Sequence, residues 1–316
     1  MLQYVTVKKY KHLNNLINLW NSEFRKSFPI KKSLYKKLIL EDENLNRDAS
    51  FVALYDNEPV GFIFIKTWLK DSGLLNESDR AHISLMYVKK EMRNMGIGSD
   101  MLKLAISEIK KHRNIRVIEV GNDIHSVFTG IPSEITSAPI FFVNKGFVQK
   151  EGVVDMIRVA RKDSLSEDYD KKGLTIQIAT EEEKDELLKL CISNSWNKEA
   201  YLINKYFDNG GTGRRIALGI KDGKIVSFVR FNDKNDLTFK VGPLLKDKKL
   251  GSIIFVKAEK KYIDEGYDDV MVQVARRYLV KRGCKKIIIL ATDNVKFYKQ
   301  LGYSALRFYM NFEMNI

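Results

Sequence analysis

Residues 88–99 of the chain read Val88-Lys-Lys-Glu-Met-Arg93-Asn-Met-Gly96-Ile-Gly98-Ser99. This stretch follows a strand-like segment, residues 83–88, and leads into apolar residues that recur at helical spacing up to residue 109. A loop in this position exposes the first backbone N–H groups of a helix, which have no partner inside the helix and carry partial positive charge. The two glycines let a ligand approach the backbone closely, and the arginine adds a charged donor. The stretch therefore predicts a site for a pyrophosphate group.

This stretch also resembles the Arg/Gln-x-x-Gly-x-Gly/Ala pattern that binds coenzyme A in the GNAT acetyltransferase superfamily. It is not a P-loop, and it has too few glycines and no opening strand-helix pair for a dinucleotide fingerprint. The resemblance implies that acetyl-CoA is bound by the end of the strand and by the loop. The residues concerned are Met86, Tyr87, Val88, Arg93, Asn94, Met95, Gly96, Ile97, Gly98 and Ser99.

Working outward, hydrophobic periodicity predicts alternating short strands and helices over the first half of the chain. The expected elements are strands 1–10, 50–55, 60–67, 83–88 and 116–120, and helices 13–24, 33–40, 99–112 and 139–146. With a final strand from Phe147, their order, β-α-α-β-β-β-α-β-α-β, is that of a GNAT domain. We expect a mixed α/β fold with a mostly antiparallel central sheet and one parallel pair, formed by strands 83–88 and 116–120.

The plan repeats in the second half of the chain. A strand at 174–179, a helix at 181–193 and a hairpin at 216–231 follow one another, and residues 293–303 repeat the fourth-helix signature of residues 139–147. The segment Gly121 to Pro132 resembles one found in some bacterial tandem GNAT proteins. The resemblance implies two tandem GNAT acyl-CoA N-acyltransferase domains, at 1–162 and 174–316, joined by a charged linker at 163–173.

The second half has no clean phosphate loop. One possible register places Lys246 to Ser252 before a helix at 252–265, and the other places Asp264 to Asp269 before a helix at 270–282. In the first, a lysine occupies a glycine position, and in the second two aspartates face the phosphate. Either departure weakens coenzyme A binding, so we expect a degenerate second copy.

Composition narrows the class of protein. The net charge is +14, but lysines are spread along the chain and no long basic tract or zinc-finger motif occurs, so a solvated surface explains the charge better than a nucleic-acid partner. Two cysteines are too few for a disulfide framework. The first residues lack the pattern of a signal peptide, and no stretch has about 18 apolar residues in a row. We expect a cytoplasmic protein without a membrane partner or a bound metal.

Acetyl transfer to an amine needs a base for the amine, a donor for the oxyanion and a proton source for the thiol. The resemblance implies that a backbone N–H near Met86 to Val88 is the oxyanion donor. Four side chains near the ends of the parallel strands are candidates for the base, and the sequence does not choose among them. They are Glu119, Asp123, His125 and His82.

The proton source is harder to assign. Many GNAT enzymes use a tyrosine on the fourth helix, but Phe142 occupies that position here, and the matching tyrosine, Tyr298, lies in the second half. Because each cofactor cleft normally lies in its own sheet, we favour a separate donor or solvent over a cleft shared by both halves. The expected function is acetyl-CoA-dependent N-acetylation of a small-molecule or peptide amine by the first half. The alternative is an acyl-CoA-binding sensor without catalysis.

Overall fold

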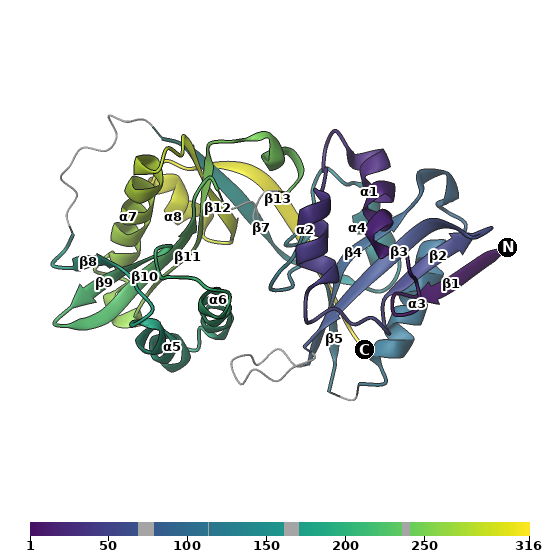
Figure 1. Ribbon diagram of the computed structural model, residues 1–316, viewed down its shortest axis with the longest axis horizontal. Coiled ribbons are helices and arrows are strands. Elements are labelled where there is room, and N and C mark those ends of the chain that lie inside the picture. Colours follow the sequence, from purple (N-terminus) through teal and green to yellow (C-terminus); the bar gives the residue numbers. More distant parts are fainter. Residues whose placement is uncertain (69–78, 113, 161–170, 236–240) are drawn as a thin grey trace.

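The computed structural model describes residues 1–68, 79–112, 114–160, 171–235 and 241–316. The two halves of the chain lie side by side, and strands β7 and β13 run from one half into the other (Figure 1). Most of the predicted linker, residues 161–170, lies outside the described residues. None of the described helices is long and apolar enough to cross a membrane.

The first half follows the predicted order of elements closely. Its helices are α1 (Leu16–Phe24), α2 (Lys32–Tyr35), which continues as the π-helical turn η2 (Lys36–Leu40), α3 (Ile97–Ile109) and α4 (Ser137–Val143). Its strands are β1 (Leu2–Thr6), β2 (Phe51–Tyr55), β3 (Glu58–Thr67), β4 (Arg80–Val88), β5 (Val117–Val120), the two-residue β6 (Ile131–Pro132) and β7 (Val148–Val159). Two 3-10 turns, η1 (Leu13–Asn15) and η3 (Lys90–Met92), precede α1 and follow β4.

The second half repeats this plan, and its second helix, α6 (Asn197–Asp208), was not predicted from periodicity. Its other helices are α5 (Lys184–Ser193), α7 (Tyr267–Lys281) and α8 (Val295–Gln300), with 3-10 turns η5 (Gly242–Lys246) and η6 (Lys260–Tyr262). Its strands are β8 (Thr175–Ile178), β9 (Ile216–Lys221), β10 (Lys224–Asn232), β11 (Leu250–Ala258), β12 (Lys286–Thr292) and β13 (Ser304–Asn315). Because residues 250–258 form a strand, a helix at 252–265 is wrong, and the loop around Gly266 is the counterpart of the phosphate loop.

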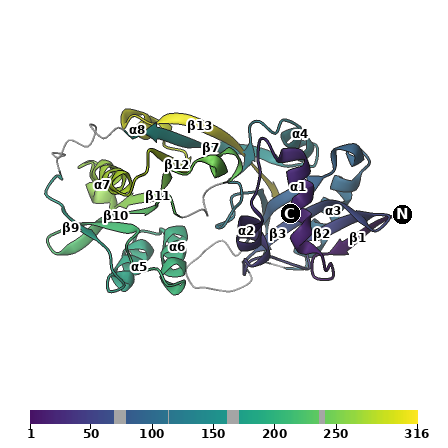
Figure 2. The ribbon, with the colours of Figure 1, turned by 45° about the horizontal axis from the view of Figure 1, so that its top comes forward.

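The two halves share one sheet. Within the described residues thirteen strands are joined in the order β1-β2-β3-β4-β5-β13-β7-β12-β11-β10-β9-β8, with β6 paired to β13. The last strand of each half crosses over: β13 pairs with β5 of the first half, and β7 pairs with β12 of the second. β7 and β13 also pair with each other from Ser304 to Glu313 (Figure 2). A cut between residues 162 and 174 therefore divides the chain but not the sheet.

Two pairs of strands in this sheet are parallel, β4 with β5 and β11 with β12, and the other pairs are antiparallel. This confirms the expected mixed sheet and adds a second parallel pair. β4 and β5 pair only from Arg80 to Ile83, and the last link is the bond from the Gly121 N–H to the Ile83 carbonyl at 2.9 Å. Beyond that point the two strands separate. Their carboxyl ends leave a gap of the kind in which open α/β sheets bind ligands.

Apolar side chains cover both faces of the sheet in each half. In the first half, α1 and α2 pack on one face and α3 and α4 on the other. In the second half, α5 and α6 cover one face and α7 and α8 the other. Ser84 forms a one-residue bulge in β4 opposite β3, because Phe64 pairs with Leu85 and Ile65 with Ile83. The bulge lies where β4 and β5 separate and turns the Ser84 hydroxyl toward the end of β5.

Candidate active site

The predicted phosphate loop leads directly into α3. Gly96 is the residue before the helix and has φ +83°, and Asn94 has φ +64°, so the chain turns sharply twice before the helix begins. No side chain caps α3, and the first bond of the helix runs from the Asp100 N–H to the Gly96 carbonyl at 2.9 Å. The N–H groups of the first turn are therefore available to an anion, as the sequence predicted.

Gly98 and Arg93 support this loop in different ways. A Cβ at position 98 would lie 3.3 Å from Met86 Cε and 3.4 Å from a ring carbon of Phe141, so the glycine allows α3 to approach both β4 and α4. Arg93 does not project freely from the loop. Its Nε donates to the Val88 carbonyl at 3.0 Å, and its guanidinium pairs with Glu23 of α1. The arginine side chain therefore ties the loop to the strand and to α1.

The corresponding loop of the second half keeps the turn but changes the chemistry. Gly266 has φ +72° and precedes α7 as Gly96 precedes α3. At the other two positions the residues differ: Asp268 replaces Gly98, and Ile263 replaces Arg93. A Cβ on Gly266 would lie 2.5 Å from the ammonium of Lys172. Carboxylates in the first turn of α7 repel a pyrophosphate, so the residues of this loop do not fit coenzyme A, whereas those of the first loop do.

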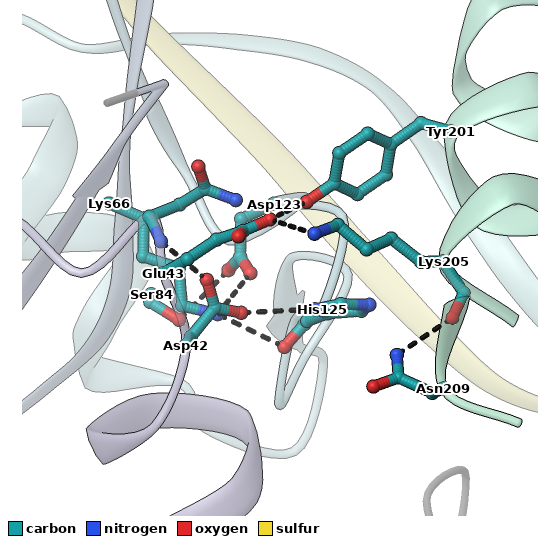
Figure 3. Close-up of polar contacts among 10 residues, drawn as sticks. Asp42, Glu43, Lys66, Ser84, Asp123, His125, Tyr201, Lys205 and Asn209 are labelled. Atoms are coloured by element: carbon teal, nitrogen blue, oxygen red, sulfur yellow. Dashed lines mark hydrogen bonds and ion pairs between the residues drawn. The ribbon is translucent and has the colours of Figure 1, made fainter. Parts of the chain in front are cut away.

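A buried polar cluster lies on the α1–α2 side of the point where β4 and β5 part (Figure 3). The ammonium of Lys66, only 2% exposed, lies 2.6 Å from Asp123 Oδ1 and 3.2 Å from Asp42 Oδ2. Asp123 also accepts a hydrogen bond from the Ser84 hydroxyl at 2.8 Å. Both oxygens of Asp123 are therefore engaged, and the carboxylate acts as a fixed partner for Lys66.

His125 connects this cluster to open space. Its Nδ1 lies 3.1 Å from Asp42 Oδ2, and 38% of its side chain is exposed. Burial alone would raise the pKa of Asp42, but the hydrogen bond from His125 and the charge of Lys66 outweigh it and lower that pKa to about 2. Because an ionised carboxylate only accepts, Nδ1 carries the proton of the neutral ring, and Nε2 has a free lone pair.

The other two predicted bases are less accessible. Glu119 pairs with Arg80 and accepts from Asn122 at 3.2 Å, so its carboxylate is neutralised at the sheet edge. His82 is 3% exposed, and its Nδ1 donates to the Gly121 carbonyl at 3.1 Å. Its Nε2 has no hydrogen-bond partner among the described residues, but the ring does not line the large cavity described next. The structure thus brings Asp123 and His125 together and leaves Glu119 and His82 in a separate contact.

A cavity of about 1210 Å³ opens between the two halves, and both halves line it. Asp42, Asp123 and His125 lie on the side of the first half, and α6 and the ends of β11 and β12 on the other. Glu43 bridges the two sides, accepting from the Tyr201 hydroxyl and pairing with the Lys205 ammonium, each at 2.6 Å (Figure 3). The exchange of β7 and β13 thus places both halves around one space.

The two fourth helices differ as the sequence indicated. Phe142 is 4% exposed and packs its ring on Phe147, with centroids 5.1 Å apart, so this position has no proton to donate. Tyr298 lines the shared cavity. Burial, with the nearby charges of Asp268 and Asp293, raises the pKa of Tyr298 to about 12, so its hydroxyl is protonated at neutral pH.

Sequence reasoning missed Asp42 and Lys66. Asp42 stands 83 residues before His125, in the turn after the π-helical end of the second helix, and no motif connects the two. Lys66 was one lysine among many, although its place in the apolar strand Val60 to Thr67, on the face of Phe62 and Phe64, is a signal for a buried and therefore paired charge. No group of side chains suited to a metal ion occurs among the described residues.

The model of the acetyltransferase (GNAT) family matches residues 13–127 and again residues 181–303. Together the matches cover more than half of the chain, which therefore belongs to this family. The result confirms the resemblance, the repeated fold and the class of enzyme, an N-acetyltransferase. Comparison of the sequence with curated proteins finds no match.

Solved structures support the tandem arrangement. A GCN5-related glucosamine N-acetyltransferase region of a fungal multi-domain GH3 β-N-acetylglucosaminidase superimposes with a TM-score of 0.84 at 17% identity, covering 99% of this chain and 38% of that one. A GCN5-related N-acetyltransferase from Sphaerobacter thermophilus gives 0.66 at 12% identity, covering 100% and 95% of the two chains. A tandem GNAT protein from the clavulanic acid biosynthesis pathway superimposes with a TM-score of 0.64 at 10% identity, covering 100% of this chain and 98% of that one. At these identities the likeness is one of fold.

Proposed function

We propose that the protein is an acetyl-CoA-dependent N-acetyltransferase whose chemistry takes place in the first half of the chain. The uncapped start of α3, the left-handed turn at Gly96 and the close approach at Gly98 fit a pyrophosphate, and the second loop, with Asp268, does not. Acetyl-CoA supplies an activated acyl group as a thioester when it is bound. The backbone of Met86 to Val88, beyond the last β4–β5 pair, is the proposed place for its acyl end.

His125 is the proposed general base, and the observation that carries the proposal is its pairing with Asp42 at the wall of the shared cavity. Asp42 fixes the tautomer, so Nε2 can accept a proton from the ammonium form of an acceptor amine. Asp42, Asp123 and Lys66 together carry one net negative charge, which stabilises the imidazolium that forms. His125 then holds a proton that it can return to the leaving group, so the proposal needs no tyrosine at position 142.

The proposed acceptor is a primary amine that enters from the shared cavity. This space is large compared with an amino acid, and both acidic and basic side chains line it, so it can hold a polar acceptor. Small-molecule and peptide amines both fit, and the named activity of the fungal structure makes aminosugars a sensible part of any test. We propose no nucleic-acid or membrane partner, and the two buried free cysteines are consistent with a cytoplasmic protein.

Transfer of labelled acetyl groups to a panel of amines tests this proposal. The panel contains glucosamine, its oligosaccharides, polyamines, amino acids and short peptides. Gly98→Asp copies the residue of the second loop, and Gly98→Ala is the steric control, since it adds a Cβ without a charge. We expect turnover with at least one amine, a loss of more than about 100-fold in Gly98→Asp and a small change in Gly98→Ala. Equal activity of wild type and Gly98→Asp would exclude the first loop as the cofactor site.

The second candidate function is that of an acyl-CoA-binding sensor. The observation in its favour is Phe142, whose buried ring replaces the tyrosine that many family members use. A sensor would bind acetyl-CoA and lose it in Gly98→Asp, but would acetylate no amine of the panel. Binding and turnover measured on the same preparation therefore separate the two functions.

A further inference from the structure

A small second pocket, of about 300 Å³, lies in the second half between α7, the end of α8 and β7. It shares no lining residue with the large cavity. Its polar lining consists of two arginines, two glutamines and a tyrosine: Arg158, Arg276, Gln273, Gln300 and Tyr303. No carboxylate lines it, so the pocket is cationic.

The two arginines are brought together without a counter-ion. Arg276 is 9% exposed, and its Nε has no hydrogen-bond partner among the residues that the structure describes. Arg158 donates to the Leu301 carbonyl and lies flat against Gly302, where a Cβ would be 3.3 Å from its guanidinium carbon. In the part of the chain that the structure describes, neither arginine forms an ion pair. Burial and the charge of Arg158 both lower the pKa of Arg276, which is the expected effect of an uncompensated positive charge.

Tyr303 adds a neutral donor to the same pocket. Its side chain is 3% exposed, and its hydroxyl, like Arg276 Nε, has no partner among the described residues. Buried hydroxyl and guanidinium groups are normally hydrogen-bonded, because leaving one unpaired is unfavourable. Both side chains line the pocket, so a ligand bound there is the candidate acceptor for their hydrogen bonds.

The first half of the chain shows that the fold does not require these polar residues. Gly96 of the first half is equivalent to Gly266, and the residue ten positions later is Ile106 in the first half and Arg276 in the second. Gly146 is likewise equivalent to Gly302, and the next residue is Phe147 in the first half and Tyr303 in the second. Met314 lies beside Gly146 as Arg158 lies beside Gly302. These three apolar residues belong to the core of the first half. The second copy has thus exchanged a packed apolar contact for an open cationic one.

We propose that this pocket binds a small oxyanion, a phosphate ion or the phosphate group of a small phosphomonoester. Two guanidinium groups match the charge of a phosphate dianion, and guanidinium is the group best suited to its oxygens. The Tyr303 hydroxyl and the Gln300 amide can donate to the remaining oxygens, whereas Gln273 Nε2 already donates to Asp269 Oδ1 at 3.1 Å. The volume admits a phosphate with a short carbon skeleton. The inference does not depend on the proposed transferase reaction.

The test is thermal unfolding of the full chain in increasing inorganic phosphate, with sodium chloride at equal ionic strength as the salt control. A parallel series with glycerol phosphate separates a free ion from a phosphomonoester. Arg276→Ile copies the first half, and Arg277→Gln, on the next residue of α7 and outside the pocket lining, is the matched control. We expect phosphate or the monoester to raise the Tm of wild type and Arg277→Gln by at least about 2 °C.

The Arg276→Ile variant tests the proposal both without and with phosphate. Without phosphate we expect its Tm to equal or exceed that of wild type, because a buried unpaired charge is replaced by the residue that the first half packs there. With phosphate we expect no rise, and at least tenfold weaker binding by calorimetry. Three outcomes would overturn the proposal: a rise equally large in sodium chloride, an undiminished phosphate response in Arg276→Ile, or no response of wild type to either anion.

Discussion

Nδ1 of His125 lies 3.1 Å from Oδ2 of Asp42, although 83 residues separate them in the chain. The contact joins the turn after the second helix to the loop after β5, and Lys66 ties the same carboxylate to Asp123. This arrangement orients one imidazole toward a cavity that both halves line. For this reason the proposed reaction depends on His125 as its general base.

His125→Gln should reduce kcat/KM by about 10²–10³, because the amine would lose its base while the loop for acetyl-CoA stays intact. Asp42→Asn should cause a smaller loss, of about tenfold or more, and should move the pH dependence of kcat/KM, because the tautomer of His125 would no longer be fixed. His112→Gln, on an exposed residue after α3, is the control and should be neutral. An active His125→Gln together with an inactive His82→Gln would contradict this prediction, because it would show that His82 is the base.

Lys66→Met should cost about 3–5 kcal/mol of unfolding free energy, because it leaves Asp42 and Asp123 buried without their shared cation. Urea unfolding measures the difference. Lys8→Met is the matched control: its pair with Asp48 is 3.2 Å long but more than half exposed, so its loss should stay below about 1 kcal/mol. Similar values for the two variants would mean that Lys66 is not a buried counter-ion.

The pKa of Asp42, about 2 in the folded protein, lies below its ordinary value of 3.8. A carboxyl group whose folded-state pKa is lowered stabilises the fold above its unfolded pKa, and the gain is lost as the pH falls through the folded pKa. The difference in unfolding free energy between wild type and Asp42→Asn should thus be constant near neutrality. It should shrink by about 2 kcal/mol from about pH 4.5 to 2. A difference that does not change with pH would show that Asp42 titrates normally.

The exchange of β7 and β13 predicts that the halves stay together after the chain is cut. A protease site inserted between residues 160 and 171 should give two fragments that co-elute on gel filtration, because the β7–β13 ladder and the β5–β13 contact hold them. In urea the fragments should separate. Separate elution under native conditions would mean that each last strand returns to its own half.

Local pattern explains why most of the first half was predictable from sequence. The helix after Gly96 has the helical period that its burial requires, and the strands beside Asp56 and before Val88 are short, mostly buried apolar runs. The loop of the second half was ambiguous because residues 250–258 are apolar enough for either a strand or a helix. In the structure they form strand β11, which pairs with β12 from Leu250 to Ile253 and with β10 from Ser252 to Ala258.

Partners that lie far apart in sequence were not predictable. A period of two marks β13 as a strand but does not say which strands it joins, so its pairing with β5 could not be read from the pattern. The shared cavity follows from that exchange. Asp42 was missed for the same reason, since nothing local links a turn aspartate to His125. His125 and Asp123 were found because they follow a predicted parallel strand, where ligand sites gather.

Calorimetric titration of the full chain with acetyl-CoA tests the central claim most directly, because it counts the loops that bind it. We expect one molecule per chain, with binding lost in Gly98→Asp and unchanged in Asp268→Asn, which alters the equivalent position of the second loop. Two molecules per chain, or one that persists in Gly98→Asp and disappears in Asp268→Asn, would contradict it.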